Sequence, residues 1–200
     1  MTEQTVSRRR RLFREALSLA GLILLVLAAR SSLADHYYVP SGSMEHTLQV
    51  GDRVVVDKRA HGLRLPFTLS RVIHGDPVER GEIVIFDSPV NGKRLIKRIV
   101  AIGGDDVLIV DGRLRINGAS LEDGIDLERF GSRVAELKLD SGGGPDIAGT
   151  VPEGMLLAVG DHRGNSLDGR AFGLVSERDI YGKAVAVYYR RGEGITWRPL

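Results

Sequence analysis

The N-terminal segment constrains the fold of this chain more than any other feature, because arginines precede a long apolar run. Residues 8–11 and Arg14 are arginine, and residues 16–29 carry no charge. If Arg30 snorkels, a helix extends to Ala34 and reaches roughly 28 Å at ~1.5 Å per residue, about the thickness of a hydrocarbon core. Because arginines stay on the cytoplasmic side of such a helix, we expect the rest of the chain on the far side.

Three interpretations of this segment stay open. The first is a retained transmembrane anchor over residues 15–34, preceded by a basic cytoplasmic tail over residues 1–14. The second is a cleavable secretory signal, because a basic start and a short apolar core lead to the small-x-small pattern of Ser32, Leu33 and Ala34. The third is a buried helix of a soluble domain. The first two place the remaining residues outside the cytoplasm.

The rest of the chain has the pattern of a mostly β protein. It is rich in glycine (25 residues) and poor in aromatic residues (6%), which fits loop-rich β structure better than a helical bundle. Asp111 and Gly112 separate two short apolar runs, which predicts a tight hairpin. Runs of β-branched and other apolar residues predict strands at residues 53–58, 82–86, 94–102, 107–110, 113–116, 155–159 and 183–189.

Two segments lack this pattern. Residues 59–80 contain Pro66 and Pro77 and predict an extended loop or irregular hairpin. Residues 120–150 are polar and rich in glycine, which predicts a flexible insertion with little core of its own. We therefore expect an antiparallel β catalytic domain with a small inserted subdomain, preceded by one N-terminal transmembrane helix. The catalytic domain spans residues 35–103 and 154–200, and the inserted cap-like β subdomain with its flexible loop spans residues 104–153.

The composition excludes several kinds of chemistry. Cysteine is absent, so the fold cannot depend on disulfides, thiol catalysis or a cysteine metal site. No histidine and aspartate cluster has the spacing of metal ligands, so we expect no metal and no other cofactor. The net charge is only +2, which predicts no nucleic-acid partner.

Ser43 is the candidate nucleophile, in the turn PSGSM at residues 40–44. A serine needs a base to become a nucleophile, and a tight turn exposes its hydroxyl. Gly42 allows the backbone to approach a substrate closely. An ordinary Ser-Gly turn or a helix cap is the alternative interpretation of these five residues.

Lys97 is the candidate general base, within the predicted strand at residues 94–102. Side chains alternate between the faces of a strand, so Lys97 shares its face with Leu95 and Ile99 and is the only charge there. Burial disfavours the ammonium form and lowers a lysine pKa, and a neutral lysine can accept a proton from a serine hydroxyl. A lysine that snorkels at a sheet edge is the alternative.

The polar loop at residues 160–170 follows a predicted strand directly. Loops at strand ends commonly hold catalytic and supporting groups, and Asp168 and Arg170 can pair to brace this loop. A solvated surface loop is the alternative. His162 stands beside Asp161, but adjacent residues of an extended loop point apart, which disfavours a histidine-based triad.

Together these segments resemble the conserved boxes of bacterial type I signal peptidase, the leader peptidase family of Ser-Lys peptidases. One such box is a weak signal, whereas five in order after an apolar segment are highly specific. The resemblance covers most of residues 15–190, outside a loop near residues 120–150. The matching boxes are PSGSMEHTL at 40–48, GDRVVV at 51–56, GEIVIF at 81–86, LIKRIVAIGGD at 95–105 and GDHRGNSLDGRAFG at 160–173.

The resemblance implies a role for each matching residue. Ser43 stands at the family's nucleophile position and Lys97 at its general-base position. Ser41 matches the serine whose hydroxyl joins the Ser43 backbone N–H in the oxyanion hole. Ser166 matches the serine that orients the lysine. The residues that match supporting polar positions around the site are Asp161, Asp168, Arg170 and Arg98.

The resemblance also implies a serine endopeptidase that removes N-terminal signal peptides from exported preproteins. It implies a single-pass protein of the bacterial cytoplasmic (inner) membrane, with its N-terminus inside and its catalytic domain on the outer or periplasmic face. The implied partners are preprotein signal peptides, the lipid bilayer and nearby secretion machinery. His46 replaces the usual proline, and Gly164 and Gly169 replace residues that are often polar, which puts rate and substrate preference in doubt.

Other function classes stay open on the sequence alone. An exported, non-catalytic β domain that binds envelope partners would leave Ser43 unreactive toward a covalent serine-directed inhibitor. A self-cleaving Ser-Lys regulator needs a DNA-binding or sensor domain, which the short apolar N-terminal segment does not supply. A lipid or ester hydrolase would carry a Gly-x-Ser-x-Gly elbow, and the turn around Ser43 does not match it.

Overall fold

The computed structural model describes residues 3–32, 34–64 and 71–200, with backbone alone at residues 3–10, 25, 28–32, 34, 63–64 and 71–74. A long N-terminal helix leads into a β domain, which contains several antiparallel sheets and short helical turns.

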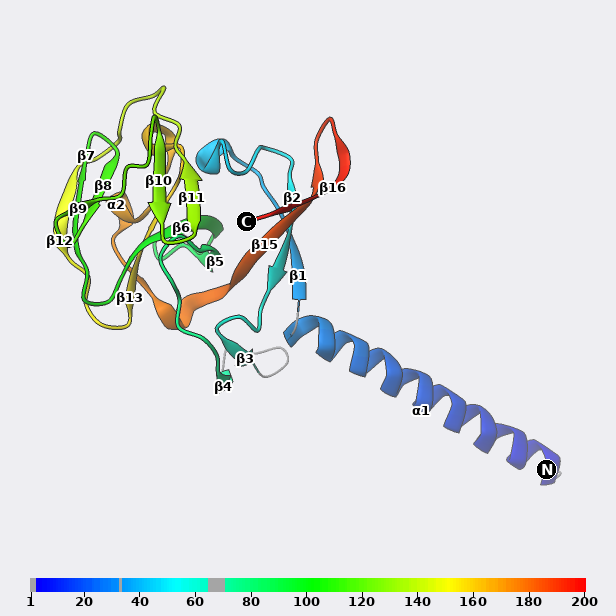
Figure 1. Ribbon diagram of the computed structural model, residues 1–200. Helices are drawn as coiled ribbons and strands as arrows, with labels where there is room; N and C mark the ends of the chain where they lie inside the picture. Colours follow the sequence, from blue (N-terminus) through cyan, green and yellow to red (C-terminus); the bar gives the residue numbers. More distant parts are fainter. Residues whose placement is uncertain (1–2, 33, 65–70) are drawn as a thin grey trace.

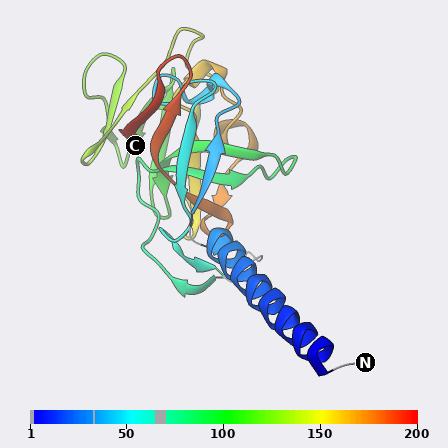
Figure 2. The ribbon, with the colours of Figure 1, turned by 90° about the vertical axis from the view of Figure 1, so that its right-hand side faces the viewer.

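The helix α1 (Glu3–Ser32) projects away from the β domain in both ribbon views (Figures 1 and 2). Large apolar side chains of its described part are exposed, including Leu17 and Leu24. Within the described part of the chain, no helix combines the length and the apolar character needed to cross a membrane. The predicted anchor at residues 15–34 falls partly outside the described residues, so it stays a prediction.

The largest sheet has eight strands and is antiparallel throughout. The strand order is β1-β2-β15-β5-β6-β13-β14, and β16 pairs with β15 off this path. The sheet contains β1 (Ala34–Tyr38), β2 (Arg53–Asp57), β5 (Ile83–Asp87), β6 (Arg94–Ile102), β13 (Met155–Val159), β14 (Val175–Ser176), β15 (Ile180–Arg190) and β16 (Gly194–Pro199). These strands confirm the mostly β prediction and include all five of the predicted strands that fall outside residues 104–153.

Strand β6 lies inside this sheet, between β5 and β13. In the β5–β6 register, Val84 pairs with Lys97 and Ile83 with Arg98. Residues 96–101 are all buried, because neighbouring elements cover both faces of the strand. Two cationic side chains, Lys97 and Arg98, therefore enter the protein interior from one strand and need buried partners there.

Residues 104–153 contain two further sheets. A four-stranded sheet has the order β12-β7-β8-β9, and β10 pairs with β11. The strands are β7 (Asp106–Val110), β8 (Arg113–Ile116), β9 (Ala119–Ser120), β10 (Leu127–Phe130), β11 (Arg133–Glu136) and β12 (Ile147–Thr150). The predicted hairpin at Asp111 and Gly112 is confirmed, since both residues have positive φ (49° and 76°) between paired β7 and β8.

The expectation of little core in residues 120–150 was wrong. Phe130, Ala135 and Leu137 are buried, and the segment forms β10, β11 and β12. Its strands have only four residues each, so their apolar periodicity was too short to stand out among the glycines. Gly131 lies at the tight turn between β10 and β11 with a φ of 63°, which explains one glycine by turn geometry.

Residues 59–80 form the predicted irregular hairpin. Strand β3 (Gly62–Arg64) pairs with β4 (Arg71–His74), with a register shift between Leu63 and Arg64. The connecting residues 65–70, which include Pro66, lie outside the described residues.

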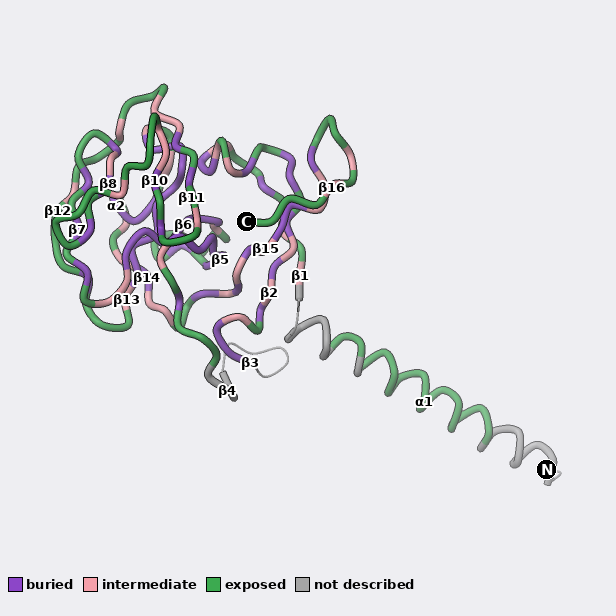
Figure 3. The backbone as a smooth tube through the Cα atoms, in the orientation of Figure 1, coloured by how far each residue is buried: buried purple, intermediate pink, exposed green. Residues whose placement is uncertain are grey.

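The buried core joins the inserted strands to the main sheet. One apolar cluster brings Val100 of β6 and Val159 of β13 together with Val107, Leu114 and other residues of the inserted segment. Figure 3 shows buried backbone along β5 and β6 and exposed backbone along the described part of α1. The inserted segment therefore packs directly behind the strands that carry the candidate site.

Candidate active site

Ser43 and Lys97, 54 residues apart in sequence, meet in the interior. Lys97 Nζ donates a hydrogen bond to Ser43 Oγ at 2.5 Å. Lys97 is 2% exposed and Ser43 is 9% exposed, so both groups are largely shielded from water, the amine more than the serine. A base within hydrogen-bond reach of a hydroxyl is the arrangement that nucleophilic catalysis requires.

The turn that carries Ser43 is fixed by its neighbours. Ser43 lies in a single 3₁₀ turn, Gly42–Met44, which follows β1. Met44 and Leu48 are fully buried in an apolar cluster with Val54 of β2. Val39, which precedes the turn, is buried in the same cluster, so both ends of the turn are anchored in the core and the hydroxyl has a defined direction.

The environment of Lys97 favours its neutral form. Burial lowers the pKa of Lys97 to about 8 from an ordinary 10.5, and Arg170 adds to this effect. The negative charges of Asp168 and Asp161 act in the opposite direction and limit the change in pKa. Because the pKa is lowered toward neutrality, part of the Lys97 amine is unprotonated near neutral pH and can accept a proton.

Asp161 and Arg98 form a buried ion pair beside the dyad. Arg98 Nε donates to Asp161 Oδ1 at 2.9 Å and Nη2 donates to Oδ2 at 2.7 Å, which is bidentate geometry. Thr47 Oγ1 donates to Asp161 Oδ2 at 2.6 Å and accepts from Arg98 Nη2 at 3.1 Å. Because Thr47 follows the nucleophile turn, this pair connects the turn to the 160–170 loop. The sequence reasoning missed Thr47, although it lies within the first quoted box.

Asp168 and Arg170 form the ion pair that the sequence predicted. Arg170 Nη2 donates to Asp168 Oδ2 at 2.8 Å, and its Nε donates to Oδ1 at 2.9 Å. Burial raises the pKa of Asp168, but the hydrogen bonds and charge of Arg170 outweigh it and hold the pKa below its usual value. Asp168 also accepts from the Gly160 N–H at 3.0 Å. The pair thus closes the 160–170 loop on itself, as the sequence predicted.

The two predicted helper serines occupy different environments. Ser41 Oγ lies 3.5 Å from Ser43 Oγ, at the long limit of a hydrogen bond. Ser166 Oγ is buried; it helps to lower the pKa of Asp168, although it makes no hydrogen bond of ordinary geometry within the described part of the chain. A Cβ added at Gly160 would lie 2.3 Å from Ser166 Oγ and 2.4 Å from the Ser43 carbonyl oxygen. Gly160 therefore separates the two serines, and only a residue without a side chain fits there.

Arg163 is a buried cation that the sequence reasoning did not single out. Its guanidinium and the Glu128 carboxylate are both fully buried and form an ion pair. Arg163 also donates to the carbonyl oxygens of Gly160 and Gly112. Glu128 belongs to the inserted segment, so this pair joins that segment to the 160–170 loop. Nothing in the local sequence pattern links two residues that are 35 positions apart.

His162 is placed away from the role of a triad base. Its Nε2 lies 2.7 Å from Asp140 Oδ1, and its Nδ1 lies 3.3 Å from the Gly42 carbonyl oxygen. Neither ring contact reaches Ser43 Oγ or Asp161. Among the described residues, no group of three or more histidine, aspartate or glutamate side chains is arranged to hold a metal ion.

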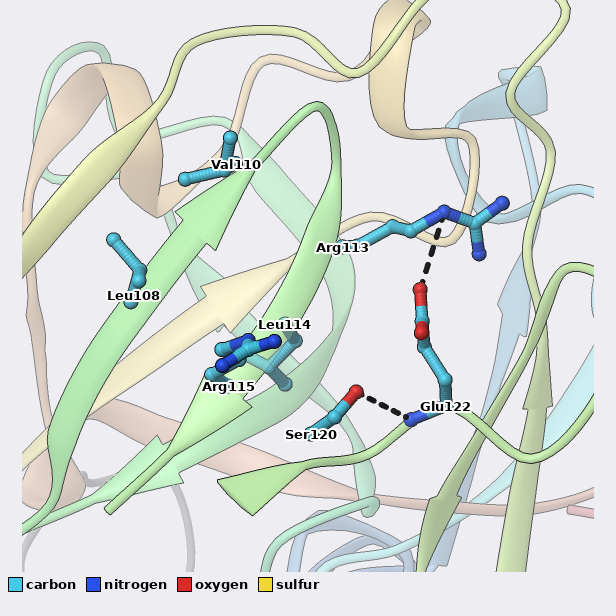
Figure 4. A pocket seen from close by; sticks show the side chains of 7 residues that line it. All are labelled: Leu108, Val110, Arg113, Leu114, Arg115, Ser120 and Glu122. Atoms are coloured by element: carbon cyan, nitrogen blue, oxygen red, sulfur yellow. Dashed lines mark hydrogen bonds and ion pairs between the residues drawn. The ribbon is translucent and has the colours of Figure 1, made fainter. Parts of the chain in front are cut away.

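A separate pocket on the β7–β8–β9 sheet does not involve the dyad (Figure 4). Arg113 Nε lies 3.2 Å from Glu122 Oε1, and the Glu122 N–H donates to Ser120 Oγ at 3.3 Å. Several polar groups of this pocket therefore already bind one another. The residues that line it are Leu108, Val110, Arg113, Leu114, Arg115, Ser120 and Glu122.

Comparison with known proteins places this site in a family. The model of the family described as signal peptidase, peptidase S26, matches residues 12–189. The chain belongs to this family. Signal peptidase I of Pseudomonas fluorescens is 36% identical in an alignment of length 198, and the match covers 84% of this chain and 69% of that protein. Signal peptidase I of Bacillus licheniformis is 29% identical over 189 residues, which cover 94% of each chain.

The match to the peptidase S26 family indicates that the chain is a peptidase. Signal peptidase I of Pseudomonas aeruginosa is a further relative, 34% identical in an alignment of length 200, and the match covers 84% of this chain and 69% of that protein. The matched residues 12–189 contain every candidate site residue described above. A peptidase needs a nucleophile or an activated water, and the buried pair of Ser43 and Lys97 is the candidate that this chain offers.

Proposed function

We propose that this chain is a membrane-bound endopeptidase that removes signal peptides from exported preproteins, with Ser43 as nucleophile and Lys97 as general base. One observation carries the proposal: the Lys97 amine lies 2.5 Å from the Ser43 hydroxyl oxygen in a buried environment that favours a neutral amine. The relatives named signal peptidase I support the substrate class.

The reaction begins when neutral Lys97 accepts the proton of Ser43 Oγ, which attacks the scissile carbonyl carbon. The negative charge on the carbonyl oxygen is stabilised by the Ser43 backbone N–H and the Ser41 hydroxyl. Loss of one such donor typically lowers the rate ~10²–10³-fold. Collapse of the intermediate breaks the peptide bond, and protonated Lys97 gives its proton to the leaving amine. The product is an ester between Ser43 and the signal peptide.

Deacylation repeats the same proton transfers with water. Lys97, neutral again, accepts a proton from a water molecule that attacks the ester carbonyl. The second intermediate collapses, the signal peptide leaves as a carboxylate, and Ser43 regains its proton. Ser166 is proposed to orient the Lys97 amine, while Asp161, Arg98, Asp168 and Arg170 hold the surrounding loops.

The proposed location is the bacterial cytoplasmic membrane, with residues 15–34 as a single anchor. The arginines at residues 8–11 would stay inside, and the β domain would lie on the outer or periplasmic face. The projection of α1 away from the β domain supports this arrangement, because a membrane helix must leave the catalytic domain free in water (Figure 1). The proposed partners are preprotein signal peptides, the lipid bilayer and nearby secretion machinery.

The test is cleavage of a purified preprotein by the full chain in detergent or vesicles. Wild type is expected to release a mature protein and a signal peptide whose masses sum to the precursor plus water. Ser43→Ala and Lys97→Met are each expected to remove cleavage, because one lacks the nucleophile and the other lacks the base. Near-normal cleavage by Lys97→Met would contradict the Ser-Lys mechanism. Failure of wild type to cleave or to react with a covalent serine-directed inhibitor would favour the non-catalytic alternative.

A further inference from the structure

His162 contacts the nucleophile turn through both its backbone and its ring. Its backbone N–H donates to the carbonyl oxygen of Ser43 at 3.1 Å. Its ring Nδ1 lies 3.3 Å from the carbonyl oxygen of Gly42. The side chain is only 5% exposed, so water does not readily replace these contacts. One residue of the 160–170 loop therefore holds the two peptide units that flank the Ser43 Cα.

The far side of the His162 ring is held by the inserted segment. Asp140 Oδ1 lies 2.7 Å from His162 Nε2. Lys138 reinforces this side, because its backbone N–H donates to the Asp161 carbonyl oxygen at 3.0 Å and its carbonyl oxygen accepts from the Arg163 N–H at 3.0 Å. The inserted segment thus runs directly beside the loop, with Asp140 aimed at the ring.

A second contact ties the same segment to the nucleophile turn. Lys138 Nζ donates to Glu45 Oε2 at 2.7 Å and lies 3.4 Å from Asp140 Oδ2. Glu45 follows directly after the turn that contains Ser43. The four side chains Glu45, Lys138, Asp140 and His162 therefore form one cluster, which we call the turn cluster.

The groups that face the two ring nitrogens of His162 determine the orientation of the ring. The Gly42 carbonyl oxygen and the Asp140 carboxylate accept hydrogen bonds but cannot donate them, so the ring N–H donates to a group that can only accept. Desolvation raises the pKa of Asp140, but the hydrogen bond from His162 and the charge of Lys138 outweigh it and keep the carboxylate ionised. Asp140 therefore orients the ring so that its other nitrogen faces Gly42.

We propose that Asp140 and His162 are a positioning pair that holds the Gly42–Ser43 turn, and with it Ser43 Oγ, at the distance from Lys97 Nζ that proton transfer requires. The inference rests on the proposed roles of Ser43 and Lys97. It assigns the inserted segment a part in reactivity, although that segment contributes no group to the dyad.

The test uses Asp140→Ala, because Asp140 is 56% exposed and its removal leaves the buried core intact. Asp140→Glu keeps the carboxylate and serves as the conservative rescue. Asp123→Ala is the matched control, since Asp123 belongs to the same segment, is 40% exposed and pairs with Arg129 away from the turn cluster. Each variant is compared with wild type in kcat and KM for preprotein cleavage and in hydrogen exchange of residues 41–48, followed by mass spectrometry.

We expect Asp140→Ala to lower kcat by about three- to tenfold with KM within about twofold, since small misplacement of reacting groups costs up to ~10²-fold in rate. Exchange in residues 41–48 should become faster, while exchange in the main sheet stays unchanged. Asp140→Glu should restore at least half of the lost rate, and Asp123→Ala should behave as wild type.

Three results would overturn the inference. One is an Asp140→Ala enzyme that matches Asp123→Ala in both kcat and exchange. Another is faster exchange at residues 41–48 with unchanged kcat. The third is a uniform increase in exchange over the whole β domain, which would mark a general loss of stability. A wild-type chain that cleaves no preprotein would contradict the proposed function instead, and the exchange comparison would still decide whether Asp140 holds the turn.

Discussion

The pH dependence of cleavage follows directly from the burial of Lys97. At a pKa of about 8, the neutral fraction of Lys97 is about 9% at pH 7, half at pH 8 and about 91% at pH 9. If neutral Lys97 is the base, kcat/KM rises about tenfold from pH 7 to pH 9 and then levels off. At the ordinary pKa of 10.5, the same interval would give a rise of about a hundredfold with no plateau.

The assay is kcat/KM for a synthetic peptide that spans a preprotein cleavage site, measured between pH 6 and pH 10.5. This ratio reports the ionisation of the free enzyme, which is the state described here. Thermal unfolding at each pH checks that the fold persists over the range. The rate of Ser43 acylation by a covalent inhibitor should show the same midpoint. A rate that keeps climbing tenfold per pH unit up to pH 10 would refute the argument that burial prepares Lys97 as a base.

Three further predictions concern single substitutions. Gly160→Ala should lower activity at least tenfold and cost about 1–3 kcal/mol of stability, because its Cβ would lie 2.4 Å from the Ser43 carbonyl oxygen. Arg163→Met should lower the free energy of unfolding by about 3–5 kcal/mol, since it leaves the Glu128 carboxylate buried without its cation. Lys97→Met should raise the free energy of unfolding at pH 7 by up to about 3 kcal/mol, because it removes a buried group whose pKa is lowered.

Matched controls and readouts separate these effects from general damage. Gly21→Ala has no atom within 4 Å of the added Cβ and should leave activity unchanged without loss of stability, since alanine is favoured over glycine inside a helix. Arg129→Gln breaks an exposed ion pair and should cost at most about 1 kcal/mol in urea unfolding. The gain from Lys97→Met should be full below pH 8 and disappear as the pH rises toward 10.5, because only then does the unfolded lysine also lose its proton. A gain that is independent of pH would contradict its electrostatic origin.

The sequence predicted those parts of the molecule that depend on local pattern. The β-branched run at residues 94–102 matches β6 residue for residue, and the Asp-Gly dipeptide specified the β7–β8 turn. Ser43 could be predicted as a nucleophile because it lies in a tight turn. Lys97 could be predicted as a base because it is the only charge on an apolar strand face. Their proximity is implied by the family resemblance alone, since no local pattern brings residues 43 and 97 together, and the distance of 2.5 Å comes from the structure.

The parts that escaped prediction are contacts between distant segments. Arg163 and Glu128 appear in the sequence as ordinary charged residues, and only the folded chain shows that both are fully buried. His162 was weighed against its neighbour Asp161, but its partner is Asp140, which the inserted segment supplies. Thr47 bridges a buried ion pair that forms across 63 residues. Tertiary packing determines such pairs, and the local pattern of a single sequence does not predict them.

The core that β6 and β13 share with residues 104–153 limits how this enzyme can be shortened. Excision of those residues would uncover Val100, Leu157 and Val159, which are buried against them. A minimal catalytic version must therefore keep these strands and shed only the tips of connecting loops. The same restriction applies to libraries that exchange residues 104–153 to alter substrate choice. Each exchange also replaces the residues that pack against Val100, Leu157 and Val159.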